Sequence, residues 1–154
     1  MLGAGTPETG AMRIGAACSD ARSPELGVPG VVRCGLVIAG LKLGLATTGF
    51  ARTLRWVERR SAHALEHPGD VAPIEAVAHA VAMAAALYPG RALCLEQSLT
   101  LYYLLRRRGI DARLRLGVQP HPFSAHAWVE YGGAPLNDFP EHVKHFIALP
   151  EVRP

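Results

Sequence analysis

The periodicity of apolar residues changes once along this chain, at Gly109, and this change limits the fold more than any other feature of the sequence. Before Gly109, apolar residues recur at the three- and four-residue spacings of helices. After it, residues 112–118 and 124–131 alternate between apolar and polar side chains, as half-buried strands do. A last strand is expected around residues 146–149. Helices followed by an antiparallel sheet indicate an α+β domain in which the last helix packs on the sheet.

Three helices are expected between residue 51 and Gly109. Residues 51–66 place apolar side chains on the face opposite their arginines, and residues 71–88 have a similar apolar face before the break at Pro89-Gly90. The third helix starts at Leu93-Cys94, and its apolar rows predict that it is largely buried. Its single polar stripe consists of Glu96, Gln97, Thr100, Tyr103 and Arg107.

Cys94, His126 and Asp138 have the residue types and the order of a cysteine-nucleophile triad. A cysteine attacks a carbonyl as the thiolate, which a nearby imidazole can generate, and a carboxylate on the other ring nitrogen fixes the tautomer. Cys94 falls in the first turn of the third helix, where unpaired backbone N–H groups and the helix dipole favour an anion. These residues form the candidate catalytic site, with the backbone N–H of Cys94 as a candidate oxyanion donor.

A Gly132-Gly133 pair after residues 124–131 predicts a hairpin. Because directly opposed residues in an antiparallel pair share a face, the loop length decides where Asp138 lies. A two-residue loop would turn Asp138 away from His126 and make Asn137 the better orienting group. A three-residue loop or a bulge would keep Asp138 on the face of His126. We predict the odd-numbered loop.

Several segments around these residues resemble the leader peptidases of lasso-peptide biosynthesis, which are transglutaminase-like cysteine enzymes. The resemblance extends over about residues 50–149, and it is most specific in the run Phe123-Ser124-Ala125-His126-Ala127-Trp128. It also includes Cys94–Leu99, Leu104–Ala112 and Asn137-Asp138. The resemblance implies a transglutaminase-like, papain-like cysteine protease core. In that core Cys94 would be the nucleophile, His126 the general base and acid, and Asp138 the orienting carboxylate.

The same resemblance implies a function and partners. These enzymes cut the leader from a ribosomally made precursor peptide, so that a separate ATP-dependent cyclase can close the macrolactam ring. Family members without a fused recognition domain depend on a small separate leader-binding protein, and we expect this chain to be of that kind. No cofactor is expected. Two other classes stay open, namely another acyl-transfer enzyme of transglutaminase or N-acyltransferase type and a non-catalytic scaffold of the maturation complex.

Met1–Gly30 is rich in small and polar residues without a sustained period, so we expect a flexible tail followed by one peptidase domain over residues 31–154. Val31–Phe50 is more apolar, but Arg33 and Lys42 interrupt it. We expect an amphipathic helix packed on the domain rather than a stable membrane span, which needs about 20 consecutive, predominantly apolar residues. No signal-peptide layout is evident.

Composition argues against several other classes of function. Three cysteines at unrelated spacings do not form a disulfide framework, and they favour a reducing, cytoplasmic compartment. A net charge of +3 without interleaved aromatic residues argues against nucleic-acid binding. The pairs His63/His67 and His142/His145 lack the other residues of a zinc motif, so no metal is expected. The exposed arginine stripe of Arg52–Arg60 is a candidate partner-binding surface.

Overall fold

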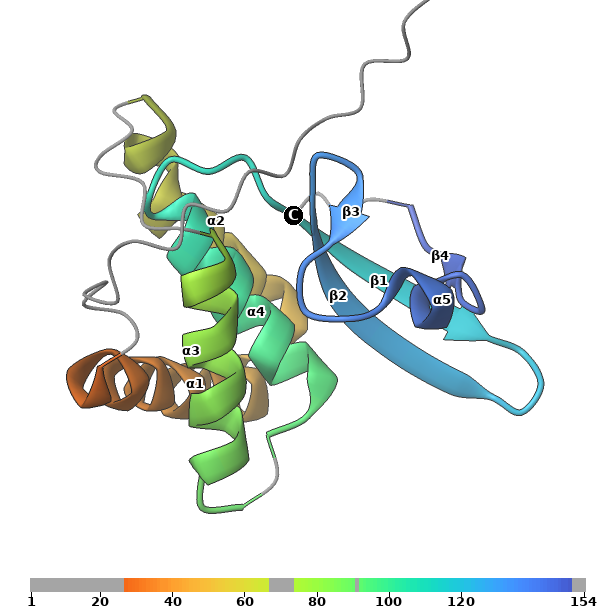
Figure 1. Ribbon diagram of the computed structural model, residues 1–154, viewed down its shortest axis with the longest axis horizontal. Coiled ribbons are helices and arrows are strands. Elements are labelled where there is room, and N and C mark those ends of the chain that lie inside the picture. The colour runs from red at the N-terminus through yellow and green to blue at the C-terminus, as the bar shows by residue number, and fades with distance from the viewer. Residues whose placement is uncertain (1–26, 67–73, 91, 151–154) are drawn as a thin grey trace, which may run out of the picture.

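The computed structural model describes residues 27–66, 74–90 and 92–150, with only the backbone described for residues 62–66. In this part of the chain, four helices come first: α1 (Val28–Thr48), α2 (Phe50–Glu66), α3 (Ile74–Leu87) and α4 (Cys94–Arg106). They are followed by β1 (Arg113–Gln119), β2 (Ser124–Tyr131), β3 (Ala134–Pro135), α5 (Pro140–Val143) and β4 (Ile147–Ala148). Helices α1 to α4 gather on one side, and the sheet lies with α5 on the other (Figure 1), which confirms the predicted α+β layout.

The central helix of the domain is α4. It contacts α1, α2, α3, β1 and β2, and Figure 1 shows it between the other helices and the sheet. Leu99 and Leu105 are fully buried, as predicted, but so are two members of the predicted polar stripe: Glu96 is 7% exposed and Thr100 is 0% exposed. The periodicity of α4 did not reveal this burial because it depends on α1, whose Lys42 lies 3.9 Å from a carboxylate oxygen of Glu96.

Helices α2 and α3 bury the faces that their periodicity predicts. Leu54 and Val57 of α2 and Val77 and Val81 of α3 all belong to the core, while the arginines of α2 are exposed. The predicted first residues of the second helix, 71–73, and the tail over residues 1–26 lie outside the described residues.

Helix α1 differs from its prediction in two ways. It begins at Val28, inside the predicted tail, and it is 21 residues long with an 18-residue window whose mean hydropathy is 1.6, so by length and composition it is sufficient to cross a membrane. It packs Cys34 and Ile38 into the core, as a helix docked on the domain should. However, it is not amphipathic, because its other face exposes Val32, Leu36 and Leu43, which are 55%, 69% and 64% exposed.

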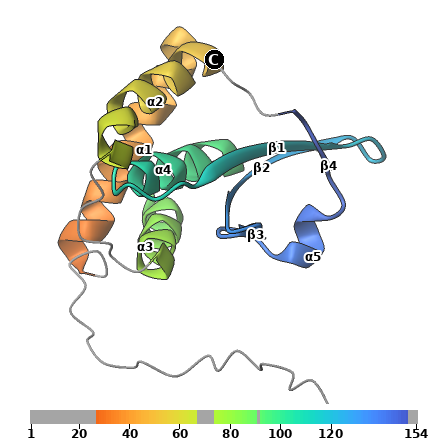
Figure 2. The ribbon, with the colours of Figure 1, turned by 90° about the horizontal axis from the view of Figure 1, so that it is seen from above.

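The sheet has the order β3-β2-β1-β4, with every neighbouring pair antiparallel. Strand β4 is the predicted final strand, and it lies at the β1 edge. Figure 2 shows the β1–β2 ribbon projecting away from the helices. In this ribbon His126 of β2 lies opposite Gly117 of β1. Gly117 also pairs with Ala148 of β4, so His126 and the C-terminal strand flank the same residue of β1.

The loop between β2 and β3 contains two residues, Gly132-Gly133, and the predicted odd-numbered loop is wrong. Tyr131 pairs directly with Ala134. The two glycines have φ values of 60° and 84°, and positive φ at both central positions is what a type I′ hairpin turn requires. Strand β3 ends after two residues, whereas the sequence pattern had suggested a strand that continued to Asp138.

Candidate active site

Cys94 is the first residue of α4, as predicted from the sequence. Leu93 before it is extended, with φ −79° and ψ 167°, and the Glu96 carboxylate accepts a hydrogen bond from the backbone N–H of Leu93. The Cys94 side chain is a half-buried free thiol. The backbone N–H groups of a first helical turn point outward without intrahelical acceptors, so an anion on this sulfur is favoured there.

Cys94 and His126 line the same pocket, which has a volume of about 490 Å³. The other lining residues are Ala92, Leu93, Gln97 and Asn137. Gln97 lies one turn after Cys94, and its side-chain amide donates to the carbonyl of Ala92 over 2.9 Å. The fold therefore brings the predicted nucleophile and the predicted base, which belong to α4 and β2, to one solvent-accessible hollow.

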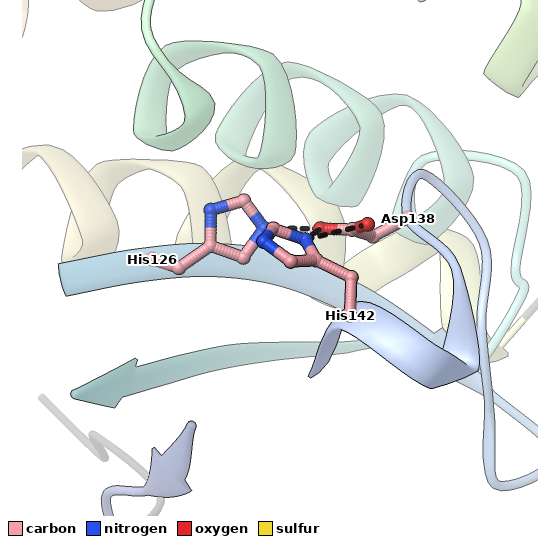
Figure 3. Close-up of side chains that lie close together, drawn as sticks. All are labelled: His126, Asp138 and His142. Atoms are coloured by element: carbon pink, nitrogen blue, oxygen red, sulfur yellow. Dashed lines mark hydrogen bonds and ion pairs between the residues drawn. The ribbon is translucent and has the colours of Figure 1, made fainter. Parts of the chain in front are cut away.

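His126 contacts Asp138 through its Nε2 atom, as Figure 3 shows. A carboxylate can only accept hydrogen bonds, so the contact places the ring proton on Nε2 and leaves Nδ1 of the neutral ring as a proton acceptor. Asp138 also accepts from the backbone N–H of Phe139 over 2.7 Å and from Nδ1 of His142 over 2.9 Å. Its side chain is only 9% exposed, so hydrogen-bond donors of the protein replace most of the water molecules that would otherwise hydrate the carboxylate.

These donors change the ionisation of Asp138. Burial acts to raise its pKa, but the hydrogen bonds from His142, the Phe139 N–H and His126 outweigh burial and lower the pKa below the ordinary value of 3.8. The carboxylate is therefore ionised at neutral pH, where it can stabilise a positive charge on His126.

Asp138 reaches His126 in spite of the two-residue loop because the chain leaves the β-ladder early. The Leu136 N–H still donates to the Val129 carbonyl over 2.8 Å, but the next acceptor for β2 is a side chain: Asn137 Oδ1 receives the Val129 N–H over 2.8 Å. Asp138, the next residue, therefore no longer alternates as a strand residue would. The predicted condition on loop length is therefore wrong, and so is the expectation that a two-residue loop would make Asn137 the orienting group.

Ser98 links α4 to β2 next to the site. Its hydroxyl donates to the Ala127 carbonyl over 2.8 Å and accepts from Nδ2 of Asn137 over 2.9 Å, and the side chain is fully buried. Ser98 lies one turn after Cys94, and Ala127 directly follows His126. This buried link therefore fixes the helix start that carries the thiol against the strand that carries the imidazole.

Replacing Ser98 by alanine should lower the free energy of unfolding by about 1–3 kcal/mol, because the carbonyl of the buried Ala127 then loses its hydroxyl donor and the Asn137 amide loses its acceptor. Denaturant unfolding followed by circular dichroism measures this change. The matched control is Ser61→Ala, since Ser61 is equally buried but its hydroxyl only donates to Val57 within its own helix. Equal losses in the two variants would contradict a specific role for the link between α4 and β2.

Aromatic packing holds the His126 ring. Its centroid lies 6.0 Å from that of Trp128 and 5.2 Å from that of Phe146. Gly117, opposite His126, makes this packing possible: a Cβ atom there would lie 2.8 Å from both the Phe146 Cβ and a Trp128 ring atom. Such distances are too short for any side chain, so the strand opposite the histidine requires glycine.

His142 is a site residue that the sequence interpretation missed. By sequence spacing it pairs only with His145, whereas in the structure His142 belongs to the short helix α5 and contacts Asp138. The spacing of four residues between Asp138 and His142 is the signal that could have found it, since residues four apart meet on a helical turn. Within the described residues, the side chains of His126, Asp138 and His142 form a group that can hold a metal ion.

Comparison with known proteins identifies related sequences. Residues 35–150 match the family described as the transglutaminase-like superfamily. The chain is 49% identical over 59 residues to the microcin J25-processing protein McjB of Escherichia coli, and the match covers 38% of this chain and 28% of McjB. The chain thus corresponds to only part of that relative. No solved structure matches the chain significantly.

Proposed function

This chain belongs to the transglutaminase-like superfamily, and we propose that it is a cysteine endopeptidase that removes the leader from a ribosomally made lasso-peptide precursor. The observation that supports this most strongly is the contact of His126 with Asp138, beside the pocket that Cys94 lines. The similarity to a protein named for processing microcin J25 supports a role in peptide processing. The cytoplasm is the proposed location, because the thiol must stay reduced.

The first half of the proposed reaction forms a thioester. Nδ1 of His126 takes the proton of Cys94, and the thiolate attacks the scissile carbonyl carbon. The backbone N–H of Cys94 donates to the oxyanion that forms, helped by the dipole of α4. His126 then gives its proton to the leaving amine, the C–N bond breaks, and the core peptide departs while the leader stays attached to the sulfur. Asp138 stabilises the transient imidazolium.

The second half of the reaction releases the leader. Nδ1 of His126 takes a proton from a water molecule, and the resulting hydroxide attacks the thioester carbonyl. The C–S bond breaks, the leader leaves with a free carboxylate, and the thiol regains a proton from His126. The chain's own residues therefore supply the nucleophile, the base and the electrostatic stabilisation, with water as the co-substrate.

The test is incubation of the purified chain with the precursor peptide encoded beside its gene, with and without the neighbouring leader-binding protein. Mass spectrometry should detect a leader that ends in a free carboxylate and a core peptide with a new amino terminus. A leader that ends in a new amide would show that the enzyme catalyses acyl transfer instead of hydrolysis. Absence of cleavage with the leader-binding protein present would reject the proposal.

The proposed partners are the precursor, a separate leader-binding protein and an ATP-dependent lasso cyclase. A hollow of about 600 Å³ between α1 and α2 is the candidate docking surface for the leader-binding protein. Leu36 and Trp56 contribute apolar walls and Gly40 leaves an open floor, while Arg33 and Arg52 provide positive charge at the rim. The sequence of α1 contains no acidic residue. This combination fits an amphipathic segment of the partner that carries acidic side chains along one edge.

Charge reversal by Arg52→Glu should reduce partner-dependent cleavage about tenfold, because rim charges steer association. Cleavage in the absence of the partner should not change. Arg55→Glu is the matched control, since Arg55 is exposed on the same helix but does not line the hollow. Binding by the leader-binding protein is measured directly by fluorescence anisotropy. Equal effects of the two variants, or a dimer of this chain that Arg52→Glu disrupts, would contradict this docking site.

A further inference from the structure

Three side chains at the edge of the proposed site present a donor set for a transition-metal ion. Nε2 of His126, a carboxylate oxygen of Asp138 and Nδ1 of His142 all lie within 4.8 Å of one another. Figure 3 shows the carboxylate between the two imidazole rings. Two imidazole nitrogens and one carboxylate oxygen are ligands that Zn²⁺ favours, and three protein ligands leave a fourth position for water.

The spacing of these atoms is close to what zinc requires. With metal–ligand bonds of about 2.0–2.2 Å, neighbouring ligand atoms of a tetrahedral site lie about 3.3 Å apart. The hydrogen bond between His142 and Asp138 is 2.9 Å long, so this pair needs little movement. His142 has a side chain that is 52% exposed and belongs to a four-residue helix, so a cation can reach it from solvent.

The rings are also held in place by a shared neighbour. The Phe146 ring centroid lies 5.2 Å from that of His126 and 5.3 Å from that of His142. Both rings thus pack on Phe146, while one nitrogen of each contacts Asp138. A metal would therefore find both of its imidazole ligands close to the carboxylate.

From this geometry we infer that His126, Asp138 and His142 form a reversible Zn²⁺ site. Zinc bound there inhibits the reaction proposed above, and this inhibitory part of the inference rests on the proposed function. Zinc bound to Nε2 of His126 replaces the proton shared with Asp138. That proton moves to Nδ1 of the neutral ring, and in the thiolate–imidazolium form one proton leaves to solvent instead. In either case Nδ1 carries a proton. The neutral form can then no longer accept the proton of Cys94, and the ion-pair form loses the imidazolium that protonates the leaving amine.

The site is distinct from a zinc site built on the nucleophile. Cys94 faces the pocket from the first turn of α4, where the positive end of the helix dipole disfavours a cation. Zinc on Nε2 of His126 lies beside Asp138 and takes no ligand from Cys94, whereas a zinc site built on the thiolate loses its sulfur ligand when Cys94 is replaced. The two arrangements therefore predict opposite effects of removing the thiol.

The experiment is calorimetric titration of the full chain with ZnCl₂, together with Cys94→Ala, His142→Gln and His145→Gln variants. The wild type, Cys94→Ala and the control His145→Gln should each bind one equivalent, while His142→Gln should bind at least about tenfold more weakly. Cobalt(II) absorption bands typical of tetrahedral coordination provide a second readout. Circular dichroism verifies the fold of each variant, and His142→Ala provides an independent replacement of the same ligand.

Inhibition is measured separately in the precursor-cleavage assay. Zinc should inhibit the wild type, a chelator should restore the rate, and His142→Gln should need at least about tenfold more zinc for the same inhibition. Loss of zinc binding in Cys94→Ala, equal affinity in His142→Gln and the wild type, or absence of binding would each overturn the inference. If no cleavage is found but zinc binds in a His142-dependent manner, the proposed function fails while the metal site stands.

Discussion

Replacing Cys94 by alanine is expected to abolish leader removal, lowering the cleavage rate by more than about 10⁴-fold. The proposed reaction passes through a bond to this sulfur, and alanine offers no nucleophile. The fold should persist, because Cys94 is half-buried at the first position of α4 and alanine is a strong helix former. Initial rates measured by mass spectrometry, together with thermal unfolding, test both parts of this prediction.

The matched control for that variant is Cys34→Ala. Cys34 is 1% exposed in the core and belongs to α1, away from the pocket that Cys94 lines. Its replacement should leave the cleavage rate within a few-fold of the wild type. If Cys94→Ala still supports cleavage at the wild-type rate, the chain acts as a scaffold or uses another nucleophile. Alkylation by iodoacetamide should label Cys94 in preference to Cys34, with loss of activity in parallel.

Replacing Asp138 by asparagine should lower the cleavage rate by about 10²- to 10⁴-fold without preventing folding. An amide is close in shape to the carboxylate but carries no charge, so it cannot stabilise the imidazolium of His126, and it can favour the wrong ring tautomer. Asp111→Asn is the control, because Asp111 is an exposed acid whose described partner is Arg106. Similar rates for Asp138→Asn and the wild type would show that Asp138 does not orient the base.

The stability of the wild type and that of Asp138→Asn should depend differently on pH. Folding lowers the Asp138 pKa from its ordinary value of 3.8, so the ionised group contributes stability at pH values above 3.8. That contribution is lost as the pH falls through the lower folded-state value. Thermal unfolding should therefore separate the wild type from Asp138→Asn at neutral pH, and the two curves should converge on acidification. A difference that persists or grows in acid would contradict the assignment of the lowered pKa.

The elements with one apolar face were predictable from the sequence. The faces of α2 and α3, the start of α4 at Cys94 and the strands β1 and β2 all follow from spacing that depends only on local chain geometry. The burial of Glu96 was not predictable in this way. It depends on α1, whose position over α4 results from tertiary packing and leaves no periodic signal in α4 itself.

The candidate site was predictable in its residue types but not in its geometry. His126 follows from the specific run that contains it, and Asp138 from its place after the hairpin. The route by which Asp138 reaches His126 was missed because strand alternation assumes that backbone groups continue the ladder. Here the Asn137 side chain takes over the Val129 N–H, and no spacing rule marks such a substitution. His142 was missed because the four-residue helix α5 is too short to have a period.

The link through Ser98 has a consequence for how related sequences can diverge. Its hydroxyl serves Ala127 and Asn137 at once. Losing Ser98 alone leaves the Asn137 amide without its acceptor, and losing Asn137 alone leaves the buried Val129 N–H without its acceptor. Substitutions at positions 98 and 137 should consequently occur together in relatives, as compatible pairs of side chains. The turn at Gly132-Gly133 carries no such coupling to the helix, and among relatives it should be free to vary in length while this pair stays fixed.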